Sequence, residues 1–355
     1  MAASHLSAGR ARGRQMPLAA RRCFRLAFAT GVALALAYGF NLGVPFIAPL
    51  FAVLLGAQPA PPPGLRQSAL LLVFLTLALG IGVLLGPLLQ YAPLSALLLI
   101  ALGLFFSNRI AIVGGKVMPS TLLAFGFTVI PAASSVSQAL ASALIAAMVL
   151  GVMVAVVSLW LVYPLFPEEG AAPGPPAGPP GAQEGDWLSL RATLIVLPAF
   201  LFTLTNPLAY LPLTVKSILL GREASRVQLR NAGRELIGST ALGGACAVLV
   251  WLCLSLAVEL WFFAGWVTLC ALWLASRATG ARHSRLAPTF WLSALTTMLI
   301  LLGAAVQDSA NGKDVFQAFA VRFSLFLAVT IYALLAMAAL EAWRARAGKT
   351  FEEIT

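Results

Sequence analysis

The chain has 355 residues, of which 60% are hydrophobic and only 10% charged, and its mean hydropathy is +0.93. A soluble globular domain carries about 25% charged residues, so this composition excludes an ordinary soluble protein and indicates a polytopic membrane protein embedded in a lipid bilayer. The net charge is +11. Because the basic residues gather between the apolar runs, membrane orientation explains them, and nucleic-acid binding need not be invoked.

The apolar runs predict an all-α fold with twelve membrane helices, six on each side of one linker. The six before the linker cover residues 24–40, 44–57, 67–89, 91–107, 118–133 and 136–164, and the six after it cover 187–204, 208–220, 235–257, 259–276, 286–305 and 317–340. The second run of each half is short, so the sequence leaves open whether it crosses the membrane or re-enters.

The linker is rich in Pro and Gly and shows no hydrophobic periodicity, which is typical of a disordered or polyproline-like connection. The sequence therefore predicts a basic cytoplasmic N-terminal segment, a first six-helix unit, a cytoplasmic linker, a second six-helix unit and a cytoplasmic tail. Their predicted bounds are 1–22, 23–165, 166–186, 187–342 and 343–355.

The distribution of Lys and Arg predicts the orientation of the helices. If the N-terminus lies inside and all twelve runs cross, only Lys313 and Arg322 of the 23 basic residues fall on the outer side. Since cytoplasmic loops accumulate basic residues, both termini are expected in the cytoplasm. An even number of helices per half also means that the second half enters from the same side as the first. The halves are therefore predicted to be parallel repeats related by a pseudo-twofold axis along the membrane normal.

Two short segments occupy matching positions in the two halves. Residues 41–56 and 206–221 each begin with Asn, end with Leu-Leu-Gly and contain proline. Paired, Pro-interrupted segments of this kind point to a transporter's substrate site, because broken helices leave backbone groups free at membrane depth. The candidate substrate-binding residues in these segments are Asn41, Pro45, Pro49, Asn206, Pro207 and Pro212. The alternative is that the two Asn residues cap helix ends and the prolines start or kink helices.

Two basic residues inside apolar runs are further candidates for substrate binding. Lys216 lies in the second short segment and Arg322 in the last predicted helix, where an unpaired charge is costly. Arg322 is expected to pair with an acid on the same side or with an anionic substrate. Those acids, which are also candidates for ion coupling, are Glu259, Asp308 and Asp314.

The ends of the predicted helices carry the remaining charges. Arg109 and Arg277 end the fourth helix of each half and are candidates for a secondary anion path, with snorkelling and orientation as the alternative. No Asp or Glu falls in the middle of a predicted helix. Outward movement of an anion needs no such acid, because each negative charge that leaves gains about 2.3 kcal/mol per 100 mV of membrane potential.

Catalytic and metal-binding patterns are missing from the sequence. The only histidines, His5 and His283, lie in basic polar segments, and there is no P-loop, so we expect neither an enzyme nor a cofactor or metal site. The glycines of the run 80–86 have the spacing of a dinucleotide loop, but they lie in a predicted membrane helix. We interpret Gly82 and Gly86 as a helix-packing face.

Three stretches carry a family resemblance: Arg21-Arg22-Cys-Phe-Arg25, Pro45-Phe-Ile-Ala-Pro49 followed by Pro61-Pro62-Pro63-Gly64, and residues 121–131. Together they resemble the fusaric acid resistance and aromatic acid exporter superfamily. The similarity is closest to a branch of small bacterial inner-membrane proteins without the large cytoplasmic domain, and it covers most of residues 20–345.

That resemblance implies efflux of aromatic or other organic carboxylates across the bacterial inner membrane, driven by membrane potential or proton motive force. It also implies a periplasmic adaptor subunit of the membrane-fusion type. A distant relation, the plant malate channels, implies that two six-helix units enclose an anion path lined by basic residues. The alternatives are a passive anion channel and a non-transporting scaffold subunit of an efflux assembly. The substrate, the coupling ion and the oligomeric state do not follow from the sequence.

Overall fold

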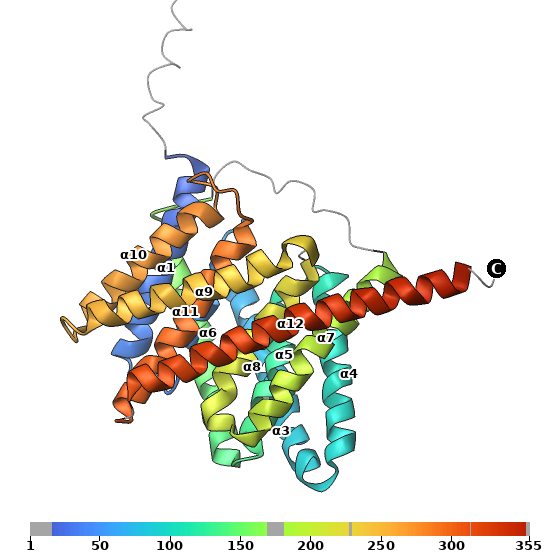
Figure 1. Cartoon of the computed structure of the whole chain (residues 1–355). Helices are drawn as coiled ribbons and strands as arrows, with labels where there is room; N and C mark the ends of the chain where they lie inside the picture. Colours follow the sequence, from blue (N-terminus) through green and yellow to red (C-terminus); the bar gives the residue numbers. More distant parts are fainter. Residues whose placement is uncertain (1–15, 169–180, 227–228, 313, 353–355) are drawn as a thin grey trace, which may run out of the picture.

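The computed structural model describes residues 16–168, 181–226, 229–312 and 314–352. In these ranges the chain forms twelve α-helices and no β-strand. They are α1 (Leu18–Gly39), α2 (Ile47–Gly56), α3 (Leu65–Tyr91), α4 (Pro93–Ile112), α5 (Val117–Ser134), α6 (Gln138–Val162), α7 (Ala182–Thr205), α8 (Pro207–Arg226), α9 (Leu229–Leu254), α10 (Leu260–Ala278), α11 (Pro288–Ala310) and α12 (Val315–Glu352) (Figure 1).

Each predicted apolar run corresponds to one of these helices. The largest difference is at the C-terminal end, where the apolar run stops at residue 340 but α12 continues to Glu352. Residues with high helix propensity, among them Ala, Glu and Arg, follow the run, so the helix outlasts its hydrophobic part. Part of the predicted linker is also helical, since α7 begins at Ala182. Residues 169–180 of the linker lie outside the described ranges.

Nine of the twelve described helices are long and apolar enough to cross a membrane. The exceptions are α1, which carries three arginines in its first turns, and the short apolar stretches of α2 and α8. A chain with this many apolar helices is a multi-pass membrane protein.

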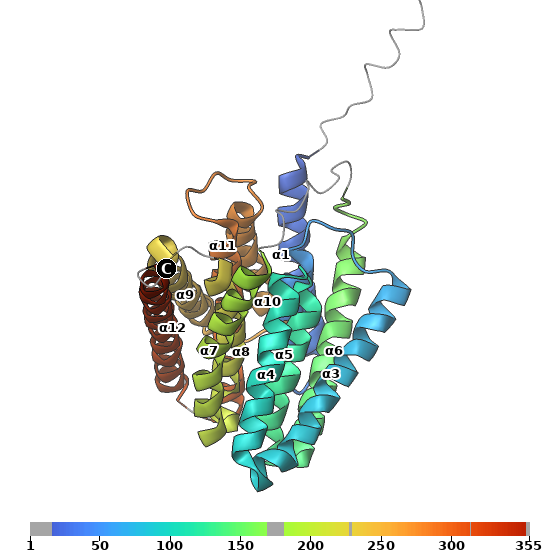
Figure 2. The same ribbon diagram turned by 90° about the vertical axis from the view of Figure 1, so that its right-hand side faces the viewer.

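Successive helices run in opposite directions, so the connections gather at two ends of the molecule (Figure 2). We call the end at which α1, α3, α5, α7, α9 and α11 begin the terminal end, and the end at which they finish the distal end. The first turn of α1 and the last turns of α12 both lie toward the terminal end (Figures 1 and 2). Each helix of the bundle, α2 and α8 included, therefore leads from one end toward the other.

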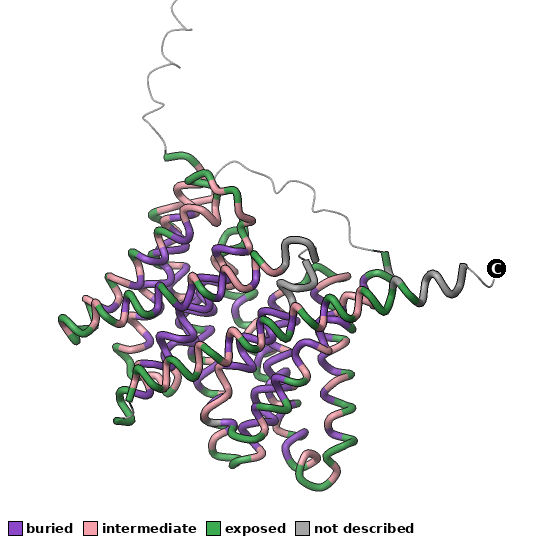
Figure 3. Tube along the Cα trace, in the orientation of Figure 1, coloured by how far each residue is buried: buried purple, intermediate pink, exposed green. Residues whose placement is uncertain are grey.

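The interior is built around α5 and α11. In the apolar 18-residue stretch of each helix, 78% of the residues of α5 and 83% of those of α11 are buried, against 22% for α12 (Figure 3). Glycines allow α3 to approach α5 closely. A side chain at Gly82 would clash with the backbone of Gly126, and one at Gly86 would clash with Ser134. The predicted packing role of Gly82 and Gly86 is thus confirmed. The short helix α2 lies against α11 and the 20-residue helix α8 lies against α5, which places both predicted short segments in the interior.

Candidate functional site

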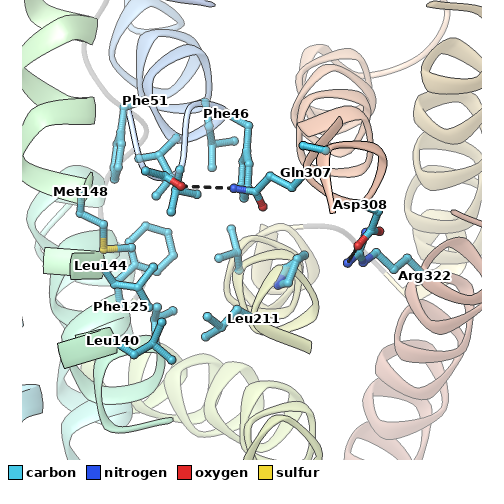
Figure 4. A pocket seen from close by; sticks show the side chains of 18 of the residues that line it. Phe46, Phe51, Phe125, Leu140, Leu144, Met148, Leu211, Gln307, Asp308 and Arg322 are labelled. Atoms are coloured by element: carbon cyan, nitrogen blue, oxygen red, sulfur yellow. Dashed lines mark hydrogen bonds and ion pairs between the residues drawn. The ribbon is translucent and has the colours of Figure 1, made fainter. Parts of the chain in front are cut away.

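A cavity of about 500 Å³ opens near the distal end, between helices of the two halves of the chain (Figure 4). We call it the distal cavity. Apolar side chains from α2, α5, α6 and α8 form most of its wall, and aromatic rings from Phe46, Phe51 and Phe125 lie on one side. Its polar groups come from α11, α12 and the turn between them: Gln307, Asp308, Asn311 and Arg322. This volume and this mixture of apolar wall and few polar groups are typical of a small-molecule site.

Arg322 forms a bidentate ion pair with Asp308 inside this cavity. Its Nη2 donates to Asp308 Oδ1 at 3.1 Å, and its Nη1 bonds the other carboxylate oxygen. The two side chains are 15% and 4% exposed. The predicted pairing of Arg322 with an acid on the same side is confirmed, and Asp308 is that acid. An anionic ligand in the distal cavity would therefore share the guanidinium with Asp308 or displace it.

A second cavity, of about 280 Å³, lies at the opposite ends of four of the same helices. We call it the terminal cavity. It is lined by the last turn of α2 and the residues after it, by Leu219 of α8 and by the first turns of α5 and α11, and it shares no lining residue with the distal cavity. Along α8 the distal lining ends at Val215 and the terminal lining begins at Leu219. The rise between these two residues along the helix axis is about 6 Å, or one helical turn. We call the level of the bundle between these two linings the intervening layer.

Along α8, Lys216 lies at the level of this layer, and its fully buried side chain lines neither cavity. Its Nζ donates to Thr297 Oγ1 at 2.8 Å and to Ser293 Oγ at 3.4 Å, both on α11. Ser239 of α9 adds a third hydroxyl, which donates to Ser293 Oγ at 3.2 Å. These hydroxyl groups compensate part of the cost of burying the ammonium.

In the first half of the chain, two aromatic rings of the distal lining lie next to this layer. Phe51 of α2 packs edge to face against Phe125 of α5, with ring centroids 6.0 Å apart and an interplanar angle of 82°. Both rings are almost completely buried. This part of the bundle thus combines an aromatic pair from α2 and α5 with an ammonium and hydroxyls from α8, α9 and α11. These are groups that bind an aromatic ring and an anion, respectively.

The predicted broken segments meet at the distal cavity, although not through all the residues expected. Pro212 lines it together with Leu211 and Val215 of α8. The lining residues of the first segment are Gly43, Val44, Phe46, Ile47, Leu50 and Phe51. Pro45 and Pro49 are buried behind this lining. Pro207 is the first residue of α8, a position in which the missing backbone N–H of proline costs nothing.

The two asparagines lie at helix ends and outside the lining of the cavity. Asn41 is exposed just after α1 with a φ of 50°, a left-handed conformation that Asn tolerates better than most residues. Asn206 is exposed before α8, and its Oδ1 accepts a hydrogen bond from the backbone N–H of Ala209 at 3.3 Å. The capping alternative accounts for both positions.

We expect Asn206→Ala to lower the free energy of unfolding by about 1 kcal/mol, because the cap of α8 is lost. Thermal unfolding of the purified protein measures this. Asn41→Gly serves as a control that keeps the left-handed turn and should be nearly neutral. An unfolding temperature of Asn206→Ala equal to that of the wild type would contradict the capping role.

Of the candidates for the secondary path and for coupling, Asp308 lines the distal cavity. The other four line neither the terminal nor the distal cavity. Arg109 pairs with Asp186 at the start of α7, and the Arg277 guanidinium stacks on Trp273 and Trp291 at 4.4 and 4.7 Å. Glu259 is exposed just before α10. Asp314 caps α12 by accepting hydrogen bonds from two backbone N–H groups, and it lines a neighbouring cavity of about 410 Å³ together with Asp308 and Arg322.

Two buried arginines near the terminal end were not predicted as site residues. Arg25 of α1 is 2% exposed and its Nη1 lies 2.6 Å from Oε2 of Glu168, while Arg191 of α7 is 5% exposed and its Nη1 lies 2.8 Å from Oε1 of Glu341. Each ion pair joins the first helix of a half to the C-terminal part of its sixth helix or to the segment that follows it. Burial alone would raise the pKa of Glu168, but its interactions with Arg22 and Arg25 outweigh burial, and its pKa is lowered. Glu168 is therefore ionised at neutral pH.

Short polar residues inside apolar helices were also missed. Ser293, Thr297 and Gln307 supply polar groups around Lys216 and in the distal cavity, and Gln307 Nε2 donates to the backbone carbonyl of Gly43 at 3.4 Å (Figure 4). A hydroxyl in a membrane helix commonly bonds its own backbone, so its position in the sequence does not distinguish a site from simple packing.

Comparison with known proteins reaches only part of the chain. Neither a curated protein nor a solved structure matches it. Residues 22–162 match the model of a family described as "Protein of unknown function (DUF2955)", a stretch that begins in the first turns of α1 and ends at the last residue of α6.

Proposed function

We propose that this protein exports organic anions, aromatic carboxylates among them, across the bacterial inner membrane along a path between its two six-helix halves. One observation carries the proposal. The distal and terminal cavities lie toward opposite ends of the same four helices, and the fully buried Lys216 lies on α8 at the level between them. In support of a solute path, ionisable residues inside a membrane helix bundle are rare and commonly mark a substrate or ion pathway.

The path also follows the proposed boundary between two repeats. In support, helix packing in one half has a counterpart six helices later: α3 packs on α5 as α9 does on α11, and α1 packs on α10 as α7 does on α4. The Arg25 and Arg191 ion pairs are a further matching pair. The family match spans one such unit, α1 to α6. In this arrangement α2, α5, α8 and α11 surround a pseudo-twofold axis along the membrane normal.

The repeat also identifies what is special about Lys216. When the segments that begin at Asn41 and Asn206 are aligned, Lys216 corresponds to Phe51. The first half therefore fills this position with an apolar ring, and packing alone does not require a cation there. We attribute the ammonium to recognition of an anion during its passage.

The orientation follows from the distribution of basic residues. We place the terminal end in the cytoplasm and the distal cavity toward the periplasm. An anion then loads from the terminal cavity, passes Lys216 and reaches the distal cavity beside Arg322. Movement in this direction is driven by the membrane potential, which is negative inside. The adaptor subunit implied by the family resemblance stays a prediction.

Flux into vesicles tests the proposal. The probe is 2-naphthalenesulfonate, a fluorescent aromatic anion that stays ionised and so does not cross the lipid as a neutral acid. Purified protein is reconstituted, and a potassium gradient with valinomycin sets the potential while the pH is equal on both sides. We expect the probe to move toward the positive compartment, with a rate that rises with the potential.

Three results would contradict this view or change it. Uptake equal to that of protein-free vesicles would favour the scaffold alternative. Uptake that follows a pH gradient at zero potential would show proton coupling in place of electrogenic movement. Absence of exchange stimulation by probe on the opposite side would indicate a passive channel, because a channel needs no conformational return step.

A further inference from the structure

A third cavity, of about 160 Å³, adjoins the terminal cavity at the cytoplasmic side of the proposed path. We call it the arginine cavity. Arg22 and Arg25 of α1 line it, and Gln58 and Thr279 add an amide and a hydroxyl. The side chain of Arg25 is 3% exposed and that of Arg22 is 28% exposed. A small cavity that holds two guanidinium groups has the donors that an anionic group requires.

Among the described residues around this cavity, two guanidiniums share one carboxylate. Both arginines pair with one carboxylate, that of Glu168, whose Oε1 accepts from Arg22 Nε at 2.6 Å. In the second half Arg191 forms the matching ion pair with Glu341, and the position that corresponds to Arg22 is Leu188. The matching ion pair is therefore made in the second half without an arginine at the position that corresponds to Arg22. Arg22 is surplus to this structural role, and it is the more accessible of the two guanidiniums.

The arginine cavity borders an apolar space. It shares Leu292 and residues 57–59 with the terminal cavity, whose wall includes Val53, Leu54 and Leu219. The two cavities together therefore offer a cationic end and an apolar body. A ligand with one carboxylate and an apolar part matches both, whereas a free inorganic anion would use the arginines alone.

We infer that the two adjoining cavities form a loading site for an amphipathic organic carboxylate on the cytoplasmic side of the path. Arg22 and Arg25 bind the carboxylate, and the terminal cavity holds the apolar part next to the intervening layer at the level of Lys216. Glu168 orients both guanidiniums and competes with the ligand for them. This inference rests on the proposed function for its orientation, and it adds a site at which substrate binds before it passes the layer.

Equilibrium binding tests the site without any gradient. The probe is 4-fluorobenzoate, titrated against the purified full-length protein in detergent and followed by ¹⁹F NMR. We expect Arg22→Gln to weaken binding about tenfold, because a charge-assisted bond is lost. Glu168→Gln should instead tighten binding several-fold, because the competing carboxylate is neutralised. Arg66→Gln, which removes an exposed arginine at the start of α3, is the matched control and should bind as the wild type does.

Affinity changes of opposite sign in Arg22→Gln and Glu168→Gln are the decisive result. If the ion pair were purely structural, either substitution would weaken it and change the affinity in the same direction. Shifts in the same direction, or affinities equal to that of Arg66→Gln, would overturn the inference. Binding of the neutral 4-fluorobenzyl alcohol should be unchanged in Arg22→Gln, and an equal loss for this probe would also overturn it. Opposite shifts without flux in vesicles would leave the site standing and refute transport. Flux without these shifts would refute the loading site alone.

Discussion

Lys216→Met is expected to reduce anion flux at least about tenfold while the protein stays folded. An ammonium contributes a charge-assisted hydrogen bond of about 1.5–3 kcal/mol to a passing anion, and methionine fills a similar volume without the charge. The hydroxyl partners do not become orphaned, because Thr297 Oγ1 also donates to the backbone carbonyl of Ser293 at 2.7 Å.

The measurement is naphthalenesulfonate flux in vesicles together with thermal unfolding of the same preparation. Lys116→Met is the matched control, since Lys116 is exposed in the connection between α4 and α5. Its flux should equal that of the wild type. Wild-type flux in Lys216→Met would remove the ammonium from the path and leave it a structural residue. The reverse substitution, Phe51→Lys, should be poorly tolerated, because it places a second charge against Phe125.

The ion pair between Arg322 and Asp308 is the second place where a large effect is expected. Arg322→Gln removes the guanidinium that bonds a carboxylate only 4% exposed, and loss of one partner of a buried pair costs about 3–5 kcal/mol. We therefore expect a lower unfolding temperature and weaker probe binding in the distal cavity. The double variant Arg322→Gln with Asp308→Asn should regain most of the stability but none of the binding, because both charges are gone.

Asp308→Asn alone separates the two roles of the pair. It keeps Arg322 and removes the carboxylate that competes with a ligand, so 4-fluorobenzoate should bind about tenfold more tightly in the distal cavity. A double-mutant cycle on unfolding temperature and on probe affinity measures the coupling. If all three variants bind the probe as the wild type does, the pair is structural and the substrate does not contact Arg322.

The sequence by itself determined the all-helical membrane fold and the approximate position of every helix. These follow from the length and apolar content of the runs, which depend on local composition. It also identified the two matching segments, because their Asn, Pro and Leu-Leu-Gly positions repeat. The sequence also predicted Lys216 and Arg322, because a charge within an apolar run stands out without any structure.

Only the tertiary structure decided which of these residues face a cavity and which partners they have. The ion pairs of Arg22 and Arg191 join residues 146 and 150 positions apart, and no local pattern specifies such a pairing. The hydroxyls of Ser293 and Thr297 resemble any others in an apolar helix until α8 places Lys216 against them. The two asparagines, prominent in the sequence, lie at helix ends because backbone geometry there favours them. Cavities arise where helices from distant parts of the chain fail to fill the space between them, and that depends on packing in three dimensions.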